Sequence, residues 1–167
     1  MYMGHLGIAL GARSARPSVP LWLLICAALL PDLANAVWNL TPIGDRNDLL
    51  SHSIPAVLVL AAVAWLVNGI ARRDWRGGAL LAALVISHLI ADYITSREAV
   101  WVGGPVIGAH LYIHHRWDMV LEGAVIIAGW ALYRKSLLAT ERVAWPLYTM
   151  LVVLLGVQFY FTLLPIT

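Results

Sequence analysis

Long apolar runs constrain the fold of this chain more than any other feature of its sequence. Four of them cover residues 20–40, 51–71, 77–96 and 142–164, and a slightly shorter one covers residues 118–133. A helix of about 20 residues crosses the hydrocarbon core of a bilayer, where only helices and closed barrels satisfy their own backbone hydrogen bonds. The sequence therefore predicts an all-α, polytopic membrane helix bundle of about five transmembrane helices.

The remainder of the chain fits the same class. The opening stretch, residues 2–12, is apolar but too short to span, so we expect a short N-terminal half-helix there. The chain is 61% hydrophobic and 12% charged, whereas soluble domains are about 25% charged. No polar stretch is long enough for a separate soluble domain, so residues 1–167 are predicted to form a single integral membrane domain. The net charge of +2 is spread over short loops, which is not the pattern of a nucleic-acid-binding surface.

The distribution of charge predicts the orientation of the chain in the membrane. Cytoplasmic loops carry an excess of Lys and Arg. Most of the basic residues fall on one side of the predicted spans: Arg13, Arg16, Arg72, Arg73, Arg76, Arg134, Lys135 and Arg142. The other side carries Asp45, Arg46, Asp48, Arg97, Glu98 and Arg116. We therefore expect the first side to face the cytoplasm.

Ionisable residues interrupt the apolar runs. Asp32 lies in the first run, His88 and Asp92 in the third, and Glu122 in the fifth. A charge at the centre of a membrane helix is disfavoured by roughly 2.5–3.5 kcal/mol on insertion scales, and such groups usually face one another around an ion or a substrate. Counted along straight helices, these residues and His52 reach similar depths near the non-cytoplasmic side. This convergence predicts one shared polar site.

The residue types at this depth favour a metal ion. His88 and Asp92 are four residues apart, so both face the same side of a helix and can bind one ion. Imidazole and carboxylate ligands together suit Zn²⁺, with Mn²⁺ or Fe²⁺ also possible. His5 is a further candidate imidazole. Asp118 and Glu122 have the same spacing and are candidates for a general base or for additional ligands.

Four short elements, in this order, resemble a known family. They are Gly4-His5, Leu30-Pro31-Asp32, Ser51-His52-Ser53, and His88 with Asp92 and Thr95. In this order the chain resembles the bacterial membrane-bound, metal-dependent hydrolase family, whose small multi-pass inner-membrane proteins carry GH, PD, THS and HxxxD elements. The resemblance covers roughly residues 3–96 and extends more loosely to Glu122. Many members have a second acid two residues after the PD, where this chain has Ala34.

The resemblance implies a set of site residues and a cellular location. The implied metal and catalytic set is His5, Asp32, His52, His88 and Asp92. The implied location is the bacterial inner membrane, and the charge distribution above predicts that the site lies toward its non-cytoplasmic side.

The resulting expectation is a membrane-embedded hydrolase in which a divalent ion, most simply Zn²⁺, activates water. Asp32, His88, Asp92 and one or both of His5 and His52 would bind the ion, and Glu122, Asp118 or His52 would serve catalysis. The expected substrate is a lipid-like amphiphile with an ester or phosphoester, and the oligomeric state is left open. Two alternatives remain: a protein that moves ions or protons along these groups, and a structural metal site without turnover.

Overall fold

The computed structural model describes residues 3–41 and 49–163. Asp45, Arg46 and Asp48, which contributed to the predicted orientation, lie outside the described residues, as does residue 164, the last of the final predicted span. The chain divides into two compact units, one formed by residues 1–25 and 111–167 and the other by residues 26–110. Each unit is described by itself.

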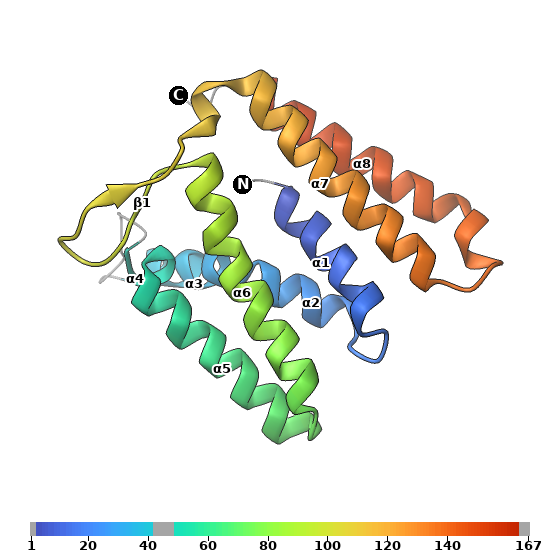
Figure 1. Ribbon diagram of the computed structural model, residues 1–167, viewed down its shortest axis with the longest axis horizontal. Coiled ribbons are helices and arrows are strands. Elements are labelled where there is room, and N and C mark those ends of the chain that lie inside the picture. Colours follow the sequence, from blue (N-terminus) through green and yellow to red (C-terminus); the bar gives the residue numbers. More distant parts are fainter. Residues whose placement is uncertain (1–2, 42–48, 164–167) are drawn as a thin grey trace. The chain divides into compact units, whose positions relative to one another are not determined.

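Helices form nearly all of the described structure (Figure 1). They are α1 (Gly4–Ala15), α2 (Leu21–Ala28), α3 (Leu30–Asn39), α4 (Leu49–His52), α5 (Ile54–Arg72), α6 (Trp75–Thr95), α7 (His115–Ser136) and α8 (Trp145–Leu163). Two short 3-10 helices, η1 (Leu111–Ile113) and η2 (Glu141–Val143), precede α7 and α8. The segment after α6 also contains an antiparallel hairpin of β1 (Glu98–Ala99) and β2 (Val106–Ile107). The predicted all-α class is confirmed apart from this hairpin.

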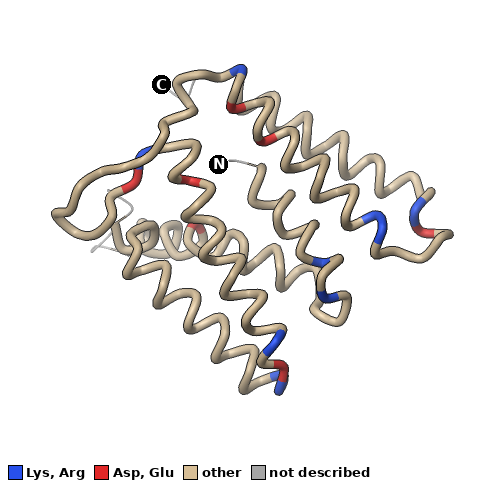
Figure 2. The backbone as a smooth tube through the Cα atoms, in the orientation of Figure 1, with Lys and Arg blue, Asp and Glu red and all other residues tan. Residues whose placement is uncertain are grey.

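Three helices are long and apolar enough to cross a membrane, namely α5, α6 and α8. A fourth crossing results if α2 and α3 together form one span. Five spans are not confirmed, because α7 is not among these helices. Charged residues near both ends of α7, among them Arg116 and Lys135, lower the mean hydropathy of this helix. Figure 2 shows Lys and Arg gathered at the turns that join α5 to α6 and α7 to α8.

The predicted single helix over residues 20–40 is wrong, because the chain bends by 60° between α2 and α3. Pro31 has no backbone N–H, so it cannot donate to the carbonyl of Ala27 four residues earlier. The helix is interrupted at Leu29 and resumes with Pro31 in the first turn of α3. The bend places Asp32 in that same first turn, where a carboxylate is favoured by the helix dipole. Depths counted along a straight helix therefore do not apply to Asp32.

A second break separates α4 from α5, within the span predicted from residue 51. Ser53 has an extended backbone, with φ −74° and ψ 153°, and Pro55 follows in the first turn of α5. Proline is well accommodated there because its missing N–H has no intrahelical partner at a helix start. The amide of Ile54 donates to the carbonyl oxygen of Val100, beside the hairpin, at 3.0 Å. His52 therefore lies at a fixed corner between two helices.

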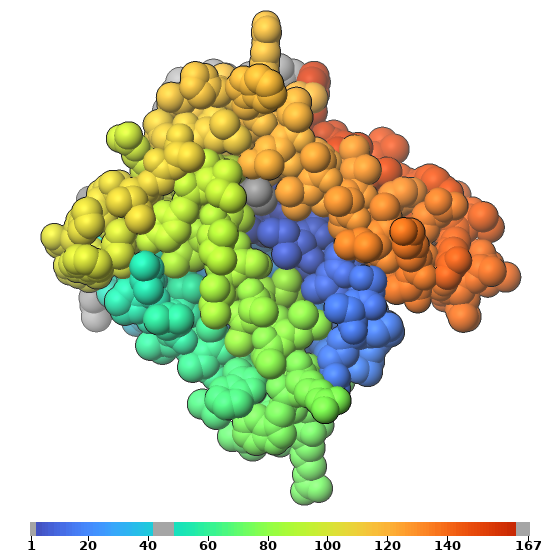
Figure 3. Space-filling model, viewed as in Figure 1, coloured from blue at the N-terminus to red at the C-terminus, as the bar shows by residue number. Residues whose placement is uncertain are grey.

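In the unit that contains the N-terminus, α1 packs against α7 through glycines. Gly7 and Gly11 are four residues apart on α1, and a Cβ atom on Gly7 would lie 2.8 Å from the Cα of Ile126. A Cβ on Gly129 would overlap the carbonyl oxygen of Gly7. Small residues at this spacing let two helix backbones approach closely. The short N-terminal helix is thus confirmed. The side chains of its partner α7 form one continuous surface with those of α8 (Figure 3).

Candidate metal centre

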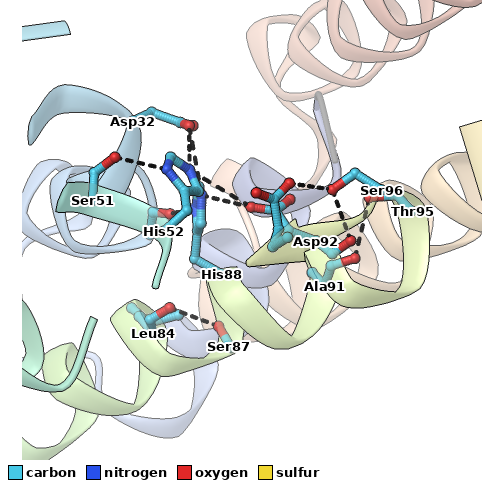
Figure 4. Close-up of polar contacts among 12 residues, drawn as sticks. Asp32, Ser51, His52, Leu84, Ser87, His88, Ala91, Asp92, Thr95 and Ser96 are labelled. Atoms are coloured by element: carbon cyan, nitrogen blue, oxygen red, sulfur yellow. Dashed lines mark hydrogen bonds and ion pairs between the residues drawn. The ribbon is translucent and has the colours of Figure 1, made fainter. Parts of the chain in front are cut away.

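Four predicted site residues converge in the unit formed by residues 26–110 (Figure 4). Asp32 comes from α3, His52 from the end of α4, and His88 and Asp92 from successive turns of α6. The Nε2 atom of His88 lies 3.0 Å from Oδ2 of Asp92 and 3.5 Å from Oδ1 of Asp32. The Nε2 atom of His52 lies 3.2 Å from Oδ1 of Asp32 and 3.8 Å from Oδ2 of Asp92. The two Nε2 atoms are 3.2 Å apart.

These separations match the spacing of atoms that share one metal ion. A tetrahedral zinc ion with bonds of about 2.0–2.1 Å holds its ligand atoms about 3.3 Å from one another. The five separations above, from 3.0 to 3.8 Å, lie on both sides of that value. The ligand atoms of Asp32, His52 and His88 all lie within 4.8 Å of one another, close enough to bind the same ion. The cluster can therefore hold a divalent cation.

The protonation of His88 strengthens this interpretation. Its Nδ1 lies 2.7 Å from the carbonyl oxygen of Ala28. A carbonyl can only accept, so Nδ1 must carry the proton, and in the neutral ring Nε2 then holds a lone pair. That lone pair faces two carboxylate oxygens and a second imidazole nitrogen. Such an arrangement needs a positive charge at its centre, either an added proton or a metal ion. A histidine whose other nitrogen donates to a carbonyl is also the usual form of a metal ligand.

The second histidine has a comparable outer contact. Nδ1 of His52 lies 2.8 Å from the hydroxyl oxygen of Ser51. The hydroxyl can accept from Nδ1, which leaves Nε2 free to bind an ion. The side chains of His52, His88 and Asp92 are buried, whereas that of Asp32 is 51% exposed. Asp32 is thus the one member of the four whose side chain is largely open to its surroundings.

The remaining predicted site residues belong to the other compact unit. His5 is buried in α1, and Asp118 and Glu122 are buried in the first half of α7. Their roles as ligand or general base stay predictions. The structure adds a different contact for Glu122, whose Oε2 accepts hydrogen bonds from the backbone amides of Met3 and Gly4, each at 2.9 Å. These amides open α1, so Glu122 acts as a cap on that helix.

The sequence predicts the four converging side chains but not the atoms that orient them. Ser51 appears there only within a motif, and nothing points to the carbonyl of Ala28. Pro31 does predict a helix break near Ala28, but its missing N–H removes only the hydrogen bond to the carbonyl of Ala27. Its contact with His88 joins residues far apart in the chain, and no local pattern encodes it.

In comparisons with known proteins, no family model matched the chain, and neither a curated protein nor a solved structure matched it significantly. The functional assignment therefore depends on the residues themselves.

Proposed function

We propose that this protein is a membrane-embedded, metal-dependent hydrolase. The observation that carries the proposal is the convergence of His52, His88 and Asp92, all buried, with the half-exposed Asp32. Residues 1–167 are proposed to form a single integral membrane domain in the bacterial inner membrane. In this proposal α7 is a fifth span and the site faces the non-cytoplasmic side.

The uneven burial of the four groups favours catalysis over a structural role. Two histidines and one carboxylate form a familiar three-ligand set in catalytic zinc sites, which keep the fourth position open. The three buried donors provide this set, and Asp32 stands at the accessible corner. A divalent ion bound there would supply an activated water molecule and a polarised scissile bond. In this proposal the Asp32 carboxylate would orient that water and accept its proton.

The surroundings of Asp32 favour an amphiphilic substrate. The neighbouring α3 residues Leu33 and Val37 are 46% and 62% exposed. An acyl chain can pack against this apolar face while an ester or phosphoester reaches the carboxylate. The proposed substrate class is therefore a lipid-like ester or phosphoester.

An ion or proton path has less support. Such a path would continue through polar groups along α5 and α6 away from the cluster. In the described part of this unit, Ser87 donates to the carbonyl of Leu84 in its own helix, and Asn68 donates to the carbonyl of Asp74 at the α5–α6 turn. Both donors bond locally, while Oδ1 of Asn68 is buried without a hydrogen-bond partner within the described residues.

The first experiment measures metal content and turnover in purified protein. Elemental analysis should find zinc or a similar ion in the wild type and in Ser87→Ala, whose hydroxyl bonds only within α6. His88→Ala should lose it while remaining folded. Turnover of acyl esters and phosphoesters in detergent should depend on added Zn²⁺ and stop with a chelator.

The variant Asp32→Asn distinguishes a catalytic metal site from a purely structural one. We expect it to retain the metal and to lose turnover. Retained metal without hydrolysis of any ester or phosphoester by the wild type would favour a structural site. Full retention of metal by His88→Ala would contradict the proposal itself.

A further inference from the structure

A basic cavity lies in the unit formed by residues 1–25 and 111–167, where α7 turns into α8. It has a volume of about 240 Å³ and is lined by Trp130, Ala131, Arg134, Lys135 and Arg142. The three cationic residues come from the last turn of α7 and from η2. Figure 2 shows them in blue on both sides of the turn.

The positive charge of this cavity is not neutralised within the described residues. In the part of the chain that the structure describes, Arg134, Lys135 and Arg142 form no ion pair. The nearby acid in sequence is Glu141, and its Oε2 already accepts a hydrogen bond from the backbone amide of Leu138 at 3.0 Å. An anion entering the cavity would therefore meet three positive charges without displacing a carboxylate from any of them.

The two arginines are held in place by contacts that leave donors available. The Arg134 guanidinium lies over the rings of Trp130 and Tyr148, at 5.7 and 5.8 Å from their centroids. Its Nε donates to the carbonyl of Arg142 at 3.2 Å. Arg142 in turn donates through Nε and Nη2 to the carbonyls of Leu137 and Lys135. Each guanidinium carries five N–H donors, so several remain for a ligand.

The cavity lies next to the start of an apolar helix. The apolar span of α8 begins at Trp145, only three residues after Arg142. The aromatic rings of Trp130 and Tyr148 lie beside Arg134, in the manner of the aromatic belt at a membrane interface. We propose that this cavity binds the phosphate group of an anionic phospholipid. Basic pockets at the ends of membrane helices recognise such headgroups, and the proposal does not depend on the hydrolase function.

The test compares lipid binding by native mass spectrometry of the full chain in detergent. Phosphatidylglycerol should bind the wild type in preference to phosphatidylcholine. The double variant Arg134→Gln/Lys135→Gln should bind phosphatidylglycerol about 25-fold more weakly, because each basic residue contributes about fivefold. The control is Arg72→Gln/Arg76→Gln, which removes the same charge at the α5–α6 turn and should bind normally.

A second variant keeps the test valid if loss of Arg134 packing unfolds the protein. Lys135→Glu replaces an exposed side chain and reverses its charge. It should weaken the binding of phosphatidylglycerol about as much as the double variant does. Equal losses in the control and in the cavity variants would overturn the proposal, because they would indicate a general effect of net charge. Displacement of the lipid by millimolar inorganic phosphate, with phosphate alone bound to the protein, would overturn the lipid as the source of the phosphate group.

Discussion

Nδ1 of His88 lies 2.7 Å from the carbonyl oxygen of Ala28, 60 residues earlier in the chain. This carbonyl is available because the helix is interrupted at Leu29, two residues before Pro31. The bend between α2 and α3 thus has two structural effects in the same unit. It presents Asp32 to the cluster, and it fixes the proton of His88 on the nitrogen that faces away from the other donors.

Replacing Pro31 tests this relationship. In Pro31→Ala the restored N–H lets the helix continue through residue 29, so the carbonyl of Ala28 bonds to its own helix instead of His88. Loss of an outer-shell partner typically weakens metal binding 10–100-fold, and we expect a loss of about that size in chelator-competition titrations with Zn²⁺. Pro146→Ala, at the start of α8, should bind zinc normally. An unchanged affinity in Pro31→Ala would show that the bend does not orient His88.

The contact of Glu122 with the start of α1 predicts an effect on stability. Glu122→Ala leaves the amides of Met3 and Gly4 without this acceptor and should lower the free energy of unfolding by about 2–3 kcal/mol. Glu122→Gln keeps an acceptor oxygen but loses its charge, and should cost about 1 kcal/mol. Unfolding in detergent, followed by circular dichroism, measures both. Glu141→Gln is the control, because its carboxylate also accepts a backbone amide but on the exposed turn. Full stability of Glu122→Ala would contradict the capping role.

The glycine contact between α1 and α7 predicts a position-specific response to a single methyl group. Gly129→Ala places a Cβ against the carbonyl of Gly7, so the two backbones must separate. We expect destabilisation of about 1–3 kcal/mol, the usual range for overpacking. Gly156→Ala on α8 is the matched control, because nothing lies within 4 Å of its added Cβ. It should be neutral or slightly stabilising, and equal melting temperatures for the two variants would argue against the close packing.

The predicted orientation can be tested by cysteine labelling. Val102, beside the hairpin, and Leu138, in the α7–α8 turn, are 68% and 71% exposed. In a Cys26→Ser background, a membrane-impermeant maleimide should label Val102→Cys in intact spheroplasts. Leu138→Cys should react only after the membrane is permeabilised. The reverse pattern would place the metal cluster on the cytoplasmic side.

Much of the fold follows from hydropathy and spacing, because membrane helices are local structures. The ranges predicted for α6 and α7 are within about three residues of those observed. The breaks at Leu29 and Ser53 were not predicted. Hydropathy remains high across Leu29, so an apolar run alone does not distinguish a straight helix from two helices joined at a proline.

The candidate site was predictable in its residue types and only partly in its geometry. The cost of placing Asp32, His88 and Asp92 in apolar segments predicts that they find partners, and they do. The role of Glu122 shows the limit of this reasoning. The predicted burial of Glu122 indicates that its carboxylate has a partner, but this partner can be either a metal ion or a backbone amide of another helix. Only the three-dimensional contact distinguishes the two.

The cap on α1 also sets an order for biogenesis. Met3 and Gly4 bond to Glu122, and Met3 also donates to Gln158, 155 residues later, at 3.2 Å. The twelve residues of α1 are too few to cross a bilayer of about 30 Å. Because Glu122 and Gln158 follow α1 in the chain, both contacts can form only after α7 and α8 have been synthesised. The start of α1 therefore leaves the ribosome before its partners exist.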